Sequence, residues 1–82
     1  MIYALVVIYN KACEMSETLK SLYKWKNDIQ IIVFDNSTKD NENEAYCEKE
    51  GMWYFTENIN LGLSKAYNYV IQRLPLKEDD YV

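Results

Sequence analysis

Apolar residues occur in three short runs, and these runs predict three strands. Residues 2–9 are continuously apolar, as expected of a strand that is covered on both faces. Residues 29–34 form a second run, rich in β-branched side chains, and residues 52–56 form a third that contains three aromatic rings. We expect each run to be a strand of one sheet, with the first buried on both faces.

The segments between and after these runs have helical patterns. Residues 15–23 and 63–74 carry apolar side chains at the spacing of one helix face. Residues 41–50 are polar and compatible with a helix, which Gly51 is placed to end. Pro75 closes the last segment. The apolar positions of the two amphipathic segments are Met15, Leu19, Leu22, Tyr23, Leu63, Tyr67, Val70 and Leu74.

The order strand–helix, repeated three times, predicts an α/β fold. We expect a three-layer α/β/α arrangement around a parallel, Rossmann-like sheet. The chain then reaches Tyr81 and Val82, which look like the start of a fourth strand. A natural domain rarely ends where a strand begins. We therefore expect residues 1–82 to be a single half-domain and a fragment of a longer protein.

Composition and charge exclude several classes of function. Nine basic and 13 acidic residues give a net charge of −4, without the basic face that nucleic-acid binding needs. Cys13 and Cys47, in a chain without histidine, do not have the spacing of a zinc site. Two thiols without a signal peptide suit a reducing cytoplasm and leave a single disulfide open. We expect Asp79 and Asp80 to form a solvated turn at the opposite edge of the sheet, and not a magnesium site.

Ligands of open parallel sheets bind beyond the carboxyl ends of the strands. That rule selects three loops, at residues 9–11, 35–38 and 58–63, which are rich in amides, hydroxyls and acids. Asp35 could accept a hydrogen bond from an imide N–H or a ribose hydroxyl. It could equally cap a turn, which is a common role of aspartate, and the pattern does not separate the two.

The residues around the third helix have similar pairs of interpretations. Asn60 could cap the helix, and Gly62 could let an anion approach the helix N-terminus, but structure alone would also explain both. Lys65 could reach a phosphate, although an isolated surface lysine is usually only solvated. For Asn68 we favour a structural tie to a neighbouring loop over contact with a ligand.

Three segments, taken in order, resemble the N-terminal part of family 2 glycosyltransferases, which have a GT-A fold. They are VVIYN at residues 6–10, VFDNST at 33–38 and NINLGLSKAYN at 58–68. The rhamnosyltransferase-like, or capsular-polysaccharide, branch is the most similar. Each segment alone is weak, but the ordered set is specific and covers nearly the whole chain.

The resemblance implies a site for a UDP- or dTDP-linked sugar. Tyr9 and Asn10 would lie against the base, and Asp35 would contact the base or the ribose. Asn60 and Gly62 would shape the floor near the donor. The residues implied to form this nucleotide-sugar site are Tyr9, Asn10, Asp35, Asn36, Ser37, Asn60, Gly62, Lys65 and Asn68.

The resemblance also implies what the chain lacks. The acidic motif with which the family holds Mg²⁺ or Mn²⁺ follows the fourth strand, beyond Val82, as do the acceptor site and the catalytic base. We therefore expect residues 1–82 to bind no metal and to transfer no sugar alone. The full-length enzyme would extend a polysaccharide or glycolipid in the bacterial cytoplasm, at the inner face of the membrane.

Two further expectations concern association and rival folds. Without a fourth strand, residues 2–9 would have an open edge, so we expect self-association. A stand-alone, non-enzymatic α/β interaction module is the alternative function, and it predicts a stable monomer without nucleotide affinity. A phospho-receiver domain fits poorly, because Tyr9 and Asn10 stand where its acidic cluster would be.

Overall fold

The sheet is built from three parallel strands in the spatial order β1-β2-β3. In the computed structural model, which describes residues 1–37, 41–57, 60–77 and 80–82, the strands are β1 (Ile2–Ile8), β2 (Ile29–Asp35) and β3 (Trp53–Thr56). The helical elements are the 3-10 helix η1 (Cys13–Met15) and the α-helices α1 (Glu17–Tyr23), α2 (Asn43–Glu50) and α3 (Leu63–Arg73). The elements follow the predicted alternation of strand and helix.

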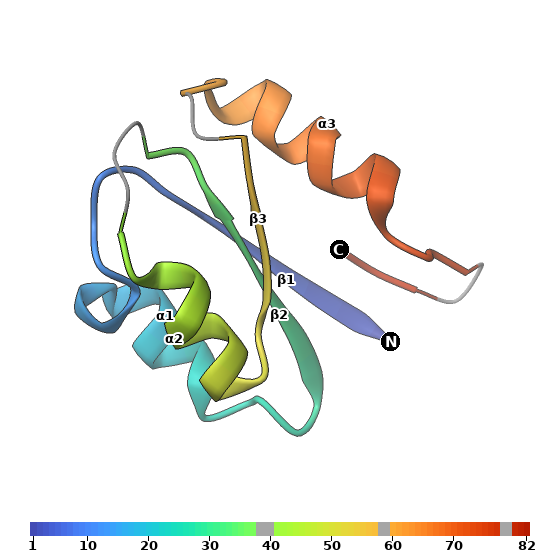
Figure 1. The fold of residues 1–82 in the computed structure, drawn as a ribbon. Coiled ribbons are helices and arrows are strands. Elements are labelled where there is room, and N and C mark those ends of the chain that lie inside the picture. Colours follow the sequence, from blue (N-terminus) through green and yellow to red (C-terminus); the bar gives the residue numbers. More distant parts are fainter. Residues whose placement is uncertain (38–40, 58–59, 78–79) are drawn as a thin grey trace.

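The helices cover both faces of the sheet, which confirms the predicted three-layer α/β/α arrangement. Figure 1 shows α1 and α2 on one face and α3 on the other. Successive side chains of a strand point to opposite faces. Along β2, Ile31 and Val33 therefore join the core beneath α1 and α2, whereas Ile32 and Phe34 join the core beneath α3.

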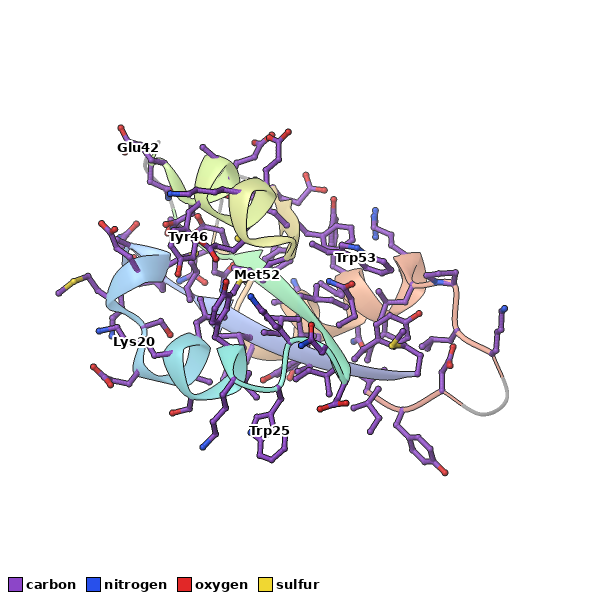
Figure 2. The ribbon with its side chains drawn as sticks, turned by 90° about the horizontal axis from the view of Figure 1, so that it is seen from below. Lys20, Trp25, Glu42, Tyr46, Met52 and Trp53 are labelled. Carbon is purple, nitrogen blue, oxygen red and sulfur yellow. The ribbon has the colours of Figure 1, made fainter. Side chains whose placement is uncertain are left out.

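Each face has its own hydrophobic core. On the side of α1 and α2, Tyr46 and Met52 lie between the two helices (Figure 2), and both pack in the cluster that contains Leu19. On the other side, the ring of Phe34 meets that of Tyr69 edge-on, with 5.3 Å between centroids. The two cores hold the sheet rigid between them, which fixes the carboxyl ends of the strands.

The first helical segment begins later than its apolar pattern predicts. Residues 13–15 form η1, and α1 begins after Ser16, whose hydroxyl accepts a hydrogen bond from the Leu19 N–H at 3.2 Å. Met15 is therefore outside the helix and is 61% exposed, so its assignment to the buried stripe was wrong. A serine cap satisfies a free N–H at the helix start, and here this capping decides the boundary.

The two glycines mark helix ends, but only one does so as expected. Gly51 has the left-handed conformation, with φ 73°, and ends α2, as predicted. Gly62, with φ 78°, is the residue that precedes α3, so Asn60 does not have the capping role that the sequence allowed. The Asn60 side chain instead accepts a hydrogen bond from the Gly62 N–H at 3.0 Å, which closes a local turn before the helix.

The end of the chain lies beside β1, where the start of a fourth strand was expected. Tyr81 forms a parallel bridge with Ile2. The Tyr3 N–H donates to the Tyr81 carbonyl at 2.7 Å, and the Tyr81 N–H donates to the Met1 carbonyl at 2.9 Å. Only the first residues of β1 are paired in this way among the described residues.

Asp80 forms a turn, but the turn is not a solvated one. Its carboxylate accepts a hydrogen bond from the Lys77 N–H at 2.8 Å and lies 3.0 Å from the N-terminal amine of Met1. With its side chain only 8% exposed, Asp80 is an ion-paired residue at the amino end of β1, far along the strand from the loops considered above. Asp79 lies outside the described residues.

None of the helices in the described parts of the chain is long and apolar enough to cross a membrane.

Candidate functional site

The carboxylate of Asp35 is the centre of a buried hydrogen-bond network, here called the Asp35 network. Asp35 ends β2 and is only 1% exposed. Its Oδ1 accepts from the Ser37 N–H at 3.0 Å. Its Oδ2 accepts from Asn41 Nδ2 at 2.9 Å, Asn43 Nδ2 at 3.0 Å and the Tyr54 hydroxyl at 2.8 Å. The bond from Ser37 closes the turn that was one of the two expected roles of Asp35.

The alternation of the strand explains why Asp35 and Asn36 serve different sides of the sheet. Asp35 continues the row of Ile31 and Val33, so its carboxylate points toward α2. Asn36 follows on the opposite row, and its Oδ1 accepts from the Leu61 N–H at 2.7 Å, which holds the loop before α3. Two adjacent polar residues thus fix loops on both faces.

Ser37 holds the loop after β1 by a hydrogen bond of the same kind. Its hydroxyl accepts from the Asn10 N–H at 2.6 Å. Asn10 has φ 47°, a left-handed conformation that asparagine tolerates better than most residues. Because Asp35, Asn36 and Ser37 all accept backbone or side-chain donors from other segments, the three predicted loops do meet at one edge of the sheet.

The charge of Asp35 is stabilised where it lies. Burial raises the pKa of its carboxyl group, but hydrogen bonds from Ser37, Asn43, Asn41 and Tyr54 outweigh burial, and the pKa lies below its usual value. Burial and the hydrogen bond to Asp35 raise the pKa of the Tyr54 hydroxyl. At neutral pH the network therefore consists of a carboxylate and neutral donors.

A cleft of about 730 Å³ lies beside this network. One wall is formed by residues 10–14 and the other by residues from Asn41 to Lys49. Asn41 and Asn43, which donate to Asp35, both line the cleft, so the cleft opens next to the buried carboxylate. Lys11, Glu14, Glu42 and Lys49 give its rim both signs of charge.

The remaining predicted site residues are not joined to the Asp35 network by hydrogen bonds among the described residues. Tyr9 directly follows β1 and is 53% exposed. Asn60 and Gly62 lie on the loop that Asn36 holds through Leu61.

Two predicted residues project from α3. Lys65 and Asn68 are both exposed. The Asn68 side chain makes no hydrogen bond within the described residues, and its tie to a neighbouring loop stays a prediction. Thr38, Asn58 and Ile59, which belong to the loops selected from the sequence, lie outside the part of the chain that is described.

Sequence reasoning missed Asn41, Asn43 and Tyr54, which supply three of the donors to Asp35. For Tyr54 the signal is the alternation of side chains along the strands. Tyr54 pairs in register with Val33, and Val33 and Asp35 point to the same face of the sheet. For Asn43 no local signal exists, because its role depends on how α2 docks.

The described residues do not fit a metal ion. No group of three or more His, Cys, Asp or Glu side chains gathers within residues 1–37, 41–57, 60–77 and 80–82. Both carboxylate oxygens of Asp35 already accept hydrogen bonds from uncharged donors.

Comparison with known proteins identifies the family. Residues 3–74 match the profile described as glycosyl transferase family 2, a span that runs from β1 to the residue after α3. No curated protein and no solved structure gives a significant match. The resemblance found from the three ordered segments is thus confirmed at the level of the family, while the branch stays a prediction. With its parallel α/β sheet and this match over most of its length, the chain belongs to glycosyl transferase family 2.

Proposed function

We propose that this chain binds the nucleoside part of a nucleotide-sugar donor for a glycosyltransferase. The donor is UDP- or dTDP-linked, and the sugar is passed to a growing polysaccharide or glycolipid. The family supports a transferase, and the observation that carries the proposal is the meeting of three loops at the carboxyl edge of the sheet. The hydrogen bonds Asn10–Ser37 and Leu61–Asn36 hold those loops together.

Within this proposal the exposed and buried residues have different tasks. Tyr9 offers a half-exposed aromatic ring on which a base could stack. The Asp35 carboxylate already accepts four hydrogen bonds, so a base or ribose would have to replace one of these donors or approach beside them. The main role of Asp35 is therefore to position the loops, and direct contact with the ligand is its secondary role.

The rest of the proposal concerns the partners of the chain. Mg²⁺ or Mn²⁺, which would offset the charge of the departing diphosphate, is held outside residues 1–82, and these residues alone transfer no sugar. The edge of β1 beyond the Tyr81 bridge pairs with a second copy. The protein works in the cytoplasm, at the inner face of the membrane.

An amide-resolved NMR titration with UDP and dTDP tests the binding site. We expect shifts of the amides of Tyr9, Asn10, Ser37 and Leu61, because these surround the meeting point of the loops. Uridine and thymidine, added separately, show whether the base and ribose suffice without the diphosphate.

Tyr9→Ala and a matched control locate the site. Tyr67, on the exposed side of α3, is also a partly exposed tyrosine, and Tyr67→Ala should leave the titration unchanged. Tyr9→Ala should weaken binding by roughly 5- to 100-fold, the range expected for losing one stacked ring. A folded protein without shifts at millimolar nucleotide, or equal losses in both variants, would overturn the proposed site.

A further inference from the structure

Two cysteines that are far apart in sequence meet in the core beneath the cleft. Cys13 lies in η1 and Cys47 in α2, and their Sγ atoms are 3.9 Å apart. Both are free thiols, both are at most 1% exposed, and they are the two cysteines of the chain. Neither takes part in the proposed nucleotide site.

Hydrogen bonds between the Asn43 side chain and backbone groups hold this pair together independently of the sulfur atoms. Asn43 precedes Cys47 by one turn of α2, and its Oδ1 accepts from the Cys13 N–H at 2.8 Å. Its Nδ2 donates to the Lys11 carbonyl at 2.9 Å. One amide side chain therefore fastens the segment that carries Cys13 to the helix that carries Cys47.

The sulfur atoms need only a small movement to form a bond. A disulfide has an S–S length of about 2.05 Å, so the two atoms must approach by roughly 2 Å. Rotation about the side-chain torsions of either residue moves Sγ without moving the helix axis. Residues 13–15 form a single 3-10 turn, which can shift more easily than a long helix.

The two thiols are not equivalent. The hydrogen bond between the two thiols lowers the pKa of Cys13, whereas the same bond and burial raise the pKa of Cys47. Of the two, Cys13 lines the cleft and Cys47 does not, so a reagent in the cleft would meet Cys13 first. The structure thus provides an attacking thiol and a second thiol behind it.

We propose that Cys13 and Cys47 form a redox-active dithiol, which a low-molecular-weight disulfide converts to an intramolecular disulfide. The Cys13 thiolate attacks one sulfur of the reagent, whose S–S bond breaks, and one thiol leaves with a proton. Cys47 then attacks Cys13 Sγ in the mixed disulfide, loses its proton and expels the second thiol. The protein loses two electrons and two protons, and the reagent gains them.

The bond would join the two walls of the cleft. Cys13 belongs to the wall of residues 10–14, and α2 forms the other wall. Oxidation would fix their separation, while reduction would leave it to the Asn43 hydrogen bonds. The geometry therefore points to a cleft whose shape responds to the thiol–disulfide state.

Oxidised glutathione tests the proposal on the folded protein, with free thiols counted by alkylation in denaturant and intact mass. We expect both thiols to disappear, the mass to fall by two hydrogen atoms, the protein to stay monomeric under non-reducing denaturing conditions, and dithiothreitol to reverse the change. The same reaction in urea shows that the reagent is active. Two thiols that stay free in the folded protein but react in urea would overturn the proposal, as would a wild type that accumulates the mixed disulfide or a disulfide-linked dimer.

Single variants separate the roles of the two thiols. Cys47→Ser should stop at one glutathione on Cys13, because no second thiol can displace it. Cys13→Ser should gain glutathione at least tenfold more slowly, since Cys47 does not line the cleft. The opposite order of rates would overturn the assignment of Cys13 as the attacking thiol. Circular dichroism confirms that each variant is folded before its rate is measured.

Discussion

Asp35→Asn tests whether the buried carboxylate holds the carboxyl edge of the sheet together. The substitution keeps the shape of the side chain but replaces one oxygen by an NH₂ group. If the NH₂ group takes the place of Oδ1, it faces the Ser37 N–H. If it takes the place of Oδ2, it faces the donors of Asn41, Asn43 and Tyr54. In either orientation at least one buried donor loses its acceptor.

The size of the effect follows from these contacts. A hydrogen bond to a charged group contributes about 1.5–3 kcal/mol, a neutral one about 1 kcal/mol, and a buried donor without an acceptor costs about 1–3 kcal/mol. Because one buried donor loses its acceptor and the remaining bonds become weaker, Asp35→Asn should lower the free energy of unfolding by about 3 kcal/mol. Since a domain of 82 residues has a free energy of unfolding of roughly 4–12 kcal/mol, this is a large fraction.

Urea denaturation, followed by far-UV circular dichroism at pH 7, measures the loss. Asp28→Asn is the matched control, because Asp28 is exposed, and it should change the free energy of unfolding by less than about 0.5 kcal/mol. Tyr54→Phe removes one hydrogen bond to the Asp35 carboxylate and leaves no donor without an acceptor, so it should lower the free energy of unfolding by about 1.5–3 kcal/mol. If Asp35→Asn costs no more than Asp28→Asn, the reasoning about the Asp35 network is refuted.

Two further predictions concern pH and association. The folded pKa of Asp35 lies below its unfolded value of about 3.8. The contribution of Asp35 to the free energy of unfolding is therefore complete above about pH 3.8 and is lost as pH falls through the folded pKa. The difference in unfolding free energy between wild type and Asp35→Asn should therefore shrink as pH falls below about 4; urea titrations at several pH values measure it, and a constant difference would contradict the linkage. For the open edge of β1, sedimentation equilibrium should show an average mass that rises with concentration, and a monomer throughout would count against pairing at that edge.

The sequence predicted the elements that depend on short-range patterns. The three apolar runs are strands, and the reason is clearest for β2, because a central strand covered on both faces needs apolar side chains on both of its rows. Gly51 ends α2, because few other residues adopt φ 73° at low cost. That the loops at Asn10, Asp35 and Leu61 meet follows from the parallel order of the strands, since their carboxyl ends share one edge.

The parts that sequence did not predict depend on contacts between distant segments. Asn43 lies eight residues after Asp35, but it reaches both Asp35 and η1 only because α2 docks against that face. Asp80 could not be assigned to the N-terminal amine without knowing that the end of the chain returns to β1. Met15 fitted the apolar stripe, but the capping hydrogen bond of Ser16 began the helix after it.

The position of Asp35 affects how any loss of nucleotide binding must be interpreted. A carboxylate that contacts the ligand and one that only positions the loops would both weaken binding when changed to an amide. The two roles differ in their relation to stability. If Asp35 only positions the loops, Asp35→Asn and Tyr54→Phe should each lose affinity in proportion to their loss of unfolding free energy. A ligand bond to Asp35 would instead make Asp35→Asn lose far more affinity than its loss of stability accounts for. Since Asn36 and Ser37 hold their loops through bonds that do not involve the Asp35 carboxylate, part of the edge survives in either variant, and the comparison can be made on folded proteins.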